Sequence, residues 1–207
     1  WLGGEGAGEA IADVLSGRVS PSGKLPETFP IHERNDLGHP GDGLKVEYRE
    51  KSDVGYRYYD KHTNEIVYPF GHGLSYTKFE YRDCKACLEN DELLVSLSVE
   101  NTGDFDGAEV VQVYINDPIS TATRPIKELK AFKKVFVRKG ETERVEIKIP
   151  MSDLGYYNIC LHKWVTEPGK YNILIGSSSQ DIRAALSVVY EKEAEYTIKR
   201  IGQDMIG

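Results

Sequence analysis

The sequence predicts a mainly β protein, in which an antiparallel β-sandwich follows a short helical and extended segment. From about residue 79, apolar and polar residues alternate with a period of two, which is typical of strands that bury one face. Turn signals such as Asn-Thr-Gly, Asp-Pro and Glu-Pro-Gly interrupt the alternation at regular spacing. Together these observations indicate roughly seven short strands. The length of 207 residues suits one or two domains.

The first segment, residues 1–31, reads as a helix followed by an extended arm. Ile11, Val14 and Leu15 have the i, i+3, i+4 spacing of one helical face. Gly17 follows the last of them and is a typical helix stop. The later stretch LPETFP cannot be helical, because each proline forces the residue before it into an extended conformation.

Residues 32–78 show little periodicity and are rich in tyrosine, glycine and proline. A connection of this length is uncommon in a compact domain unless it is functional or wraps a neighbour. We expect an ordered linker that lies on another surface. Its end, YPFGHGLSYT, contains two glycines around His72, and glycine adopts backbone conformations that other residues avoid. The stretch therefore predicts a corner between domains, with His72 as a structural residue.

The sandwich is expected over residues 79–191, with a first strand near Phe79. Trp164 opens one of the later strands, and we expect it in the core, because such sandwiches commonly bury one tryptophan. The tail, residues 192–207, is polar and predicts no packed element. The remaining strands, including two about Arg-Lys-Gly-Glu-Thr and two about Glu-Pro-Gly, are expected within 93–103, 108–118, 127–150, 164–179 and 184–191.

Composition and charge narrow the classes of function. The 33 acidic and 26 basic residues give a net charge of −7, which disfavours nucleic acid as a partner. No apolar run approaches the ~20 residues that span a bilayer, so no membrane partner is expected. The first residues have neither a signal-peptide pattern nor a methionine, and a chain that opens on Trp1 suggests a cut or processed piece. We expect a cytoplasmic location.

The three cysteines are an odd number, which does not fit a secreted disulfide framework. Cys84 and Cys87 have the CxxC spacing of a zinc or redox motif, but a zinc site needs two further ligands, and no second pair follows. We interpret them as ordinary thiols in or beside a strand. No metal and no cofactor is expected.

Several motifs, in order along the chain, resemble the C-terminal part of glycoside hydrolase family 3, the β-glucosidase family. They are WLGGEGAGEAIADVLSGRVSPSGKLPETFP, YPFGHGLSYT, VENTGDFDGAEVVQVYINDP and WVTEPGKYNILIGSSS. The resemblance implies that residues 1–31 end an α/β sandwich domain and that residues 79–191 form a fibronectin type III-like domain. His72 departs from the family pattern, which more often has an aromatic residue between the two glycines.

The resemblance also implies that the catalytic groups lie elsewhere. Retaining glycosidases use two carboxyl groups about 5–5.5 Å apart. In this family the nucleophile lies on a barrel, in a motif similar to Ser-Asp-Trp, and the acid/base glutamate lies upstream; neither motif is present. Asp53 and Asp153 only superficially resemble the nucleophile, and Glu5 and Glu9 suit the start of a helix, where negative charge is favourable. We expect no catalytic residue in this chain.

Two aromatic residues are candidates for substrate binding. Trp1 precedes a glycine-rich turn and can stack on a sugar in an intact enzyme, although burial statistics favour a core or interface position. Tyr58 belongs to a cluster with Tyr56 and Tyr59 that can line a carbohydrate cleft. The alternative is that the cluster holds the linker on a neighbouring domain, with rings buried and hydroxyls hydrogen-bonded.

The sequence therefore predicts a non-catalytic C-terminal region of a family 3 glycoside hydrolase, inactive by itself. Its expected partners are the missing barrel and sandwich domains, in the same or a separate chain, and a β-glucoside or oligosaccharide would be the substrate of the assembled enzyme only. The alternatives are a stand-alone carbohydrate-binding module and a protein-interaction module. Self-association is also expected if the apolar face of the first helix has lost its usual cover.

Overall fold

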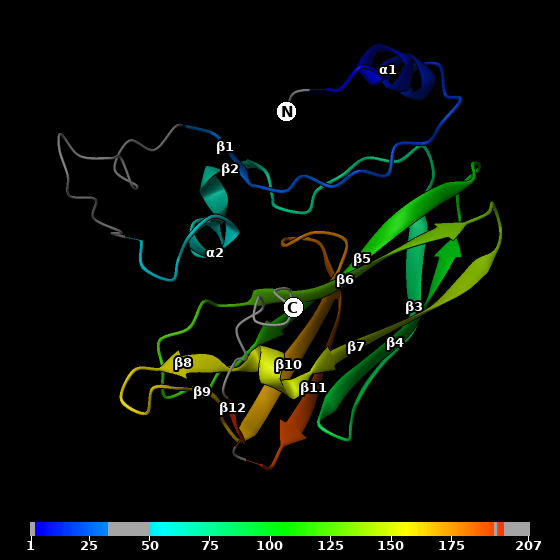
Figure 1. Cartoon of the computed structure of the whole chain (residues 1–207). Coiled ribbons are helices and arrows are strands. Elements are labelled where there is room, and N and C mark those ends of the chain that lie inside the picture. The colour runs from blue at the N-terminus through cyan, green and yellow to red at the C-terminus, as the bar shows by residue number, and fades with distance from the viewer. Residues whose placement is uncertain (1–2, 33–49, 193, 197–207) are drawn as a thin grey trace, which may run out of the picture.

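The computed structural model describes residues 3–32, 50–192 and 194–196 (Figure 1). The described part contains a sandwich, a helix that stands away from it, and a linker between the two. The helices are α1 (Ala7–Leu15) and α2 (Tyr56–Tyr59), with 3₁₀ turns η1 (Thr63–Glu65) and η2 (Met151–Leu154). The strands are β1 (Phe29–Pro30), β2 (Ile66–Tyr68), β3 (Phe79–Glu89), β4 (Glu92–Asn101), β5 (Gly107–Asn116), β6 (Glu128–Val137), β7 (Thr142–Pro150), β8 (Tyr156–Asn158), β9 (Lys163–Thr166), β10 (Gly169–Gly176), β11 (Ile182–Tyr190) and β12 (Ala194–Tyr196).

The predicted antiparallel sandwich is confirmed. One sheet has the strand order β11-β10-β5-β6 and the facing sheet has the order β3-β4-β7, with every neighbouring pair antiparallel. Strand β4 shows strict alternation, and Leu93, Val95, Leu97 and Val99 are all buried. They meet buried aliphatic residues of β5, β7 and β10 in one core. Complete burial of such a side chain stabilises the fold by roughly 1.5–3 kcal/mol.

Strand β5 is buried on both faces, because the linker covers its outer side. Val111 and Val113 point into the core, whereas Gln112 and Tyr114, which alternate with them, are also buried. A strand covered on both sides needs no polar face, which explains the run VVQVY. The linker thus continues the packing of the sandwich.

The expectation that Trp164 lies in the sandwich core was wrong. Its strand, β9, does not join either large sheet; it pairs with β8 and β12 in a separate three-stranded sheet. Trp164 is only partly buried there and packs edge-on against Tyr157, with 5.8 Å between ring centroids. The tail was expected to form no packed element, yet residues 194–196 form β12.

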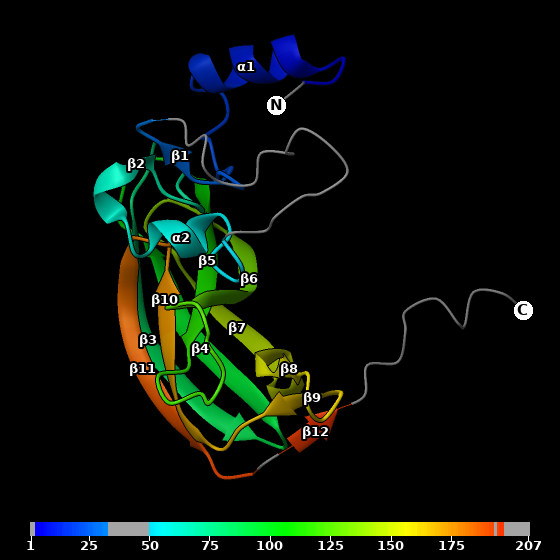
Figure 2. The same cartoon turned by 90° about the vertical axis from the view of Figure 1, so that its left-hand side faces the viewer.

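Helix α1 stands at one end of the molecule and the small sheet at the other, in both views (Figures 1 and 2). The predicted stop at Gly17 is confirmed. Gly17 has φ +75°, and the amides of Gly17 and Arg18 donate to the carbonyls of Val14 and Asp13, which is a Schellman C-cap. No residue of α1 is buried, so its apolar face is open.

Candidate functional site

The candidate site is the region where the linker meets the sandwich, and it begins with the corner at Gly71. Gly71 has φ +78°, and a Cβ there would overlap Oε1 of Gln112. His72 extends the corner: its carbonyl accepts from the amide of Leu25, and its ring stacks on Tyr68 at 5.2 Å. The corner needs glycine both for the backbone angle and for close approach. These contacts support a structural role for His72.

Gln112 is the centre of the contact between this corner and the sandwich. Its Nε2 donates to the carbonyls of Gly71 (3.1 Å) and Ser177 (2.6 Å), and its Oε1 accepts from the hydroxyl of Tyr114 (2.6 Å). Sequence reasoning missed this residue. The available signal was a lone amide in the apolar run VVQVY, since a buried polar group requires partners.

Helix α2 is attached to the same surface by one buried ion pair. Nζ of Lys127 lies 2.5 Å from Oδ1 of Asp60, and the two side chains are 9% and 1% exposed. Nε2 of Gln180 also donates to Oδ1 of Asp60, at 3.0 Å. Burial raises the pKa of Asp60, although hydrogen bonds from Lys127 and Gln180 act against it. Asp60 follows α2, Lys127 precedes β6, and Gln180 lies in the β10–β11 loop. These contacts therefore hold three segments together.

Tyr56 gives α2 its second attachment. Its hydroxyl accepts the amide hydrogen of Leu129, at 2.7 Å, and its ring stacks on Phe70 at 4.6 Å. Arg57, next to it, donates to Glu128 at 3.0 Å. We define the docking seam as Tyr56, Asp60, Phe70 and Gly71 on the linker, with Gln112, Tyr114, Lys127 and Leu129 on the sandwich. Tyr56 agrees with the interpretation that the tyrosine cluster holds the linker in place.

Tyr58, the candidate for substrate binding, lies on α2 but outside the docking seam. It is partly buried. Its ring stacks on His62, with centroids 4.0 Å apart, and meets Tyr59 edge-on at 5.1 Å. A role of Tyr58 toward a sugar stays a prediction. Trp1, the other candidate, lies outside the described residues.

The carboxylates that resemble a catalytic motif occupy ordinary positions. Asp53 precedes α2, and its Oδ2 accepts from Nζ of Lys61 at 2.5 Å. Asp153 is exposed in η2, and Glu9 lies in the first turn of α1. Cys84 and Cys87 both lie in β3, in agreement with the interpretation that they are thiols of a strand. Within the described residues, no group of three or more metal-ligating side chains comes together.

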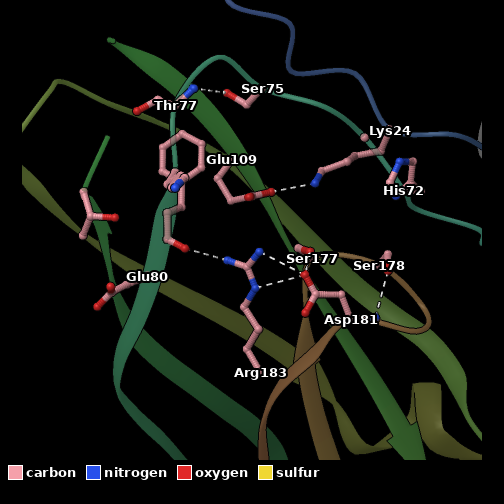
Figure 3. A pocket seen from close by; sticks show the side chains of 14 residues that line it. Lys24, His72, Ser75, Thr77, Glu80, Glu109, Ser177, Ser178, Asp181 and Arg183 are labelled. Atoms are coloured by element: carbon pink, nitrogen blue, oxygen red, sulfur yellow. Dashed lines mark hydrogen bonds and ion pairs between the residues drawn. The ribbon is translucent and has the colours of Figure 1, made fainter. Parts of the chain in front are cut away.

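A polar cleft opens beside the docking seam (Figure 3). Its volume is about 420 Å³, and it lies between the arm at Lys24, the corner after His72 and the β10–β11 loop. Two ion pairs face it: Lys24 with Glu109 at 2.8 Å, and Arg183 with Asp181 at 3.0 Å. Figure 3 shows both pairs converging on the same space.

The charges in this cleft are held in place. Burial alone would raise the pKa of Asp181, but hydrogen bonds from Ser177 and Arg183 outweigh it and hold that pKa below its usual value. Arg183 also donates to the carbonyl of Phe79 at 2.8 Å, and its guanidinium lies 4.6 Å from the centroid of the Tyr81 ring. Groups fixed in this way are arranged before any ligand arrives.

Comparison with known proteins gives two family matches. The glycosyl hydrolase family 3 C-terminal domain matches residues 1–76, and the fibronectin type III-like domain matches residues 109–179. No helix in the described part of the chain is long and apolar enough to cross a membrane.

Individual relatives cover nearly the whole chain. The thermostable β-glucosidase B of Acetivibrio thermocellus is 48% identical over 189 residues, which cover 88% of this chain and 25% of that protein. A β-glucosidase of Bacteroides ovatus is 40% identical over 201 residues, which cover 92% of this chain and 27% of that protein. The structure of β-glucosidase 3B from Thermotoga neapolitana in complex with α-D-glucose matches with a TM-score of 0.87 and 42% identity. The match covers 96% of this chain and 28% of that one. The chain thus spans about a quarter of these relatives.

Proposed function

The chain belongs to glycoside hydrolase family 3 and corresponds to the C-terminal region of its β-glucosidases, and from this premise we propose that it is a non-catalytic support for the catalytic domains. The supporting surface is α1 with the linker. The hydrolysis of β-glucosides, and any partner domains, would belong to the assembled enzyme. The chain spans about a quarter of its relatives, which leaves room for a barrel and the remainder of an α/β sandwich domain in the other three quarters.

One observation carries this proposal: exposed apolar side chains are frequent on α1, on the arm that follows it and on the linker. Ile11 is 58% and Leu15 is 78% exposed, on a helix without a buried residue. A soluble surface seldom leaves so many apolar side chains together unless a partner covers them. More than half of the exposed large hydrophobic side chains in the described residues lie in this part, namely Ile11, Leu15, Val19, Phe29, Ile31, Val54, Val67, Tyr68, Leu74 and Tyr76.

The sandwich explains why such a chain can act as a support. Its core is closed, with residues of β4, β5, β7 and β10 fully buried. The docking seam then fixes the linker on this closed body through one buried ion pair and the hydrogen bonds of Gln112. A rigid body with an apolar end can hold a neighbouring domain in one orientation, because the apolar area removed from water favours one docked state.

Complementation tests the proposal. The purified chain is titrated against an upstream polypeptide from the A. thermocellus relative, ending where its similarity to this chain begins, and hydrolysis of an aryl β-glucoside is measured. We expect activity only in the mixture. The variant Leu15→Asp should weaken complementation, whereas Val189→Asp, at a valine of β11 that is 63% exposed, should not.

Three outcomes would contradict this function. Turnover by the chain alone would show that it is catalytic. Full activity of the upstream polypeptide, without stimulation by the chain, would rule out support. Equal effects of Leu15→Asp and Val189→Asp would show that α1 is not the contact surface. Sedimentation velocity of the chain alone separates docking from self-association through the same face.

A further inference from the structure

The polar cleft beside the docking seam has the size of a small-molecule site. Its volume of about 420 Å³ falls within the roughly 300–1,000 Å³ of typical ligand pockets. Unlike most of them, it is lined largely by charged and hydroxyl side chains, with Phe79 and His72 as its aromatic residues. A ligand for this cleft must therefore satisfy many hydrogen-bonding groups at once.

The charges around the cleft are balanced. Three cationic residues (Lys24, Lys78 and Arg183) and three anionic residues (Glu80, Glu109 and Asp181) line it. A ligand with a net charge would be attracted by one set and repelled by the other. A neutral ligand meets no such opposition, and the fixed charges strengthen the hydrogen bonds that it makes.

The two ion pairs leave hydrogen-bonding capacity that faces the cleft. Lys24 contacts Oε1 of Glu109, and Arg183 contacts Oδ2 of Asp181; within the described residues, Oε2 of Glu109 and Oδ1 of Asp181 accept no hydrogen bond. The ammonium of Lys24 has three N–H donors and forms an ion pair with one oxygen of Glu109. Hydrogen-bond acceptors and donors thus both line the cleft. A hydroxyl group suits this arrangement because it donates and accepts at once.

We propose that this cleft binds a neutral polyhydroxylated molecule of about monosaccharide size. Its hydroxyls would donate to the open oxygens of Glu109 and Asp181 and accept from Lys24, and its C–H face would lie against Phe79. The lowered pKa of Asp181 keeps that carboxylate ionised at neutral pH, as an acceptor requires. This site goes beyond the supporting role, since the chain alone would show it whether or not upstream domains dock.

An NMR titration of the ¹⁵N-labelled full chain tests the proposal. The probes are D-glucose and myo-inositol, with D-glucuronate and D-glucosamine as charged analogues of the same ring. We expect saturable shifts of amides around Lys78, Glu109 and Ser178 with the neutral probes, and weaker binding of both charged analogues. Binding of glucose alone would identify a sugar site, and binding of inositol as well would identify a general polyol site; both agree with the proposal.

Variants link the binding to the cleft. Asp181→Asn should raise the Kd for glucose roughly tenfold, because it weakens a hydrogen bond to a charged acceptor. The matched control is Asp153→Asn, at an exposed aspartate outside the cleft. Since Asp181 also orders its own loop through Ser177, a second variant is needed. Thr102→Trp, at an exposed wall residue, should fill the cleft and abolish binding.

The proposal would be overturned by any of three results. The first is the absence of saturable shifts with both neutral probes. The second is a set of shifts that Thr102→Trp leaves unchanged, which would place binding elsewhere. The third is stronger binding of glucuronate or glucosamine than of glucose, which would contradict the argument from balanced charge.

Discussion

Removal of Lys127 offers the sharpest test of how the linker is held. Lys127→Met keeps most of the apolar length of the side chain but leaves Asp60, which is 1% exposed, without its cation. Loss of one partner of a buried pair costs about 3–5 kcal/mol, because the other charge stays buried and uncompensated. The raised pKa of Asp60 limits this cost, since the carboxyl can take up a proton instead. We expect the variant to weaken the docking of α2 on the sandwich by about 3 kcal/mol.

The amide of Leu129 reports this docking, because it donates to the hydroxyl of Tyr56 only while α2 is in place. Hydrogen exchange of this amide should accelerate roughly 100-fold in Lys127→Met, since each 1.36 kcal/mol is a factor of ten. The amide of Val113, in the core strand β5, is the internal control and should exchange as before.

A double variant separates charge from shape. Asp60→Asn with Lys127→Met removes both charges and keeps a side-chain oxygen for Gln180. Replacement of both partners by neutral groups is much less costly than loss of one, so exchange of the Leu129 amide should return most of the way to the original rate. If the Leu129 amide exchanges as fast in the double variant as in Lys127→Met, the cost does not come from an uncompensated charge on Asp60, and the reasoning fails.

Three further predictions concern stability, each measured by urea unfolding. Gly71→Ala should cost at least about 2 kcal/mol more than Gly140→Ala, since both have positive φ but only Gly71 has a neighbouring atom in the way; equal costs would contradict this. Leu93→Ala should cost about 2–5 kcal/mol, because Leu93 is fully buried, and a cost below 1 kcal/mol would exclude the described core. Burial pushes the pKa of Glu128 up, but Arg124, Lys130 and Arg57 outweigh it and hold that pKa below 4.5. Ionised Glu128 therefore stabilises the fold above pH 4.5 and loses this contribution as the pH falls through its lowered pKa; Glu128→Gln should flatten this pH dependence, and an unchanged profile would refute it.

Local sequence patterns predicted most of the elements, because they depend on near neighbours. The period of two and the turn signals gave the strands of the sandwich, and the spacing of Ile11, Val14 and Leu15 with Gly17 gave α1 and its end. The corner at Gly71 and His72 was also predictable, since few sequences combine a proline with two glycines at such short spacing without a sharp turn. The hydrophobic period and the turn-forming residues indicate the type and the ends of an element within a few residues of sequence.

Trp164 shows where the same reasoning failed. Alternation identifies a strand but not the sheet that it joins, because pairing is decided by partners distant in the chain. Strand β9 has the pattern of a sandwich strand but pairs with β8 and β12. An aromatic residue on a predicted strand was therefore assigned to the wrong layer.

The sequence by itself determined the family and the strand pattern. Only the tertiary structure decided which polar groups act together. Asp60 and Lys127 are 67 residues apart, Gln112 and Ser177 are 65 apart, and Phe79 and Arg183 are 104 apart. Each is unremarkable in its own segment. They become a docking seam and a polar cleft because the linker folds back over β5, where burial removes water and each polar group must find its partner in the protein.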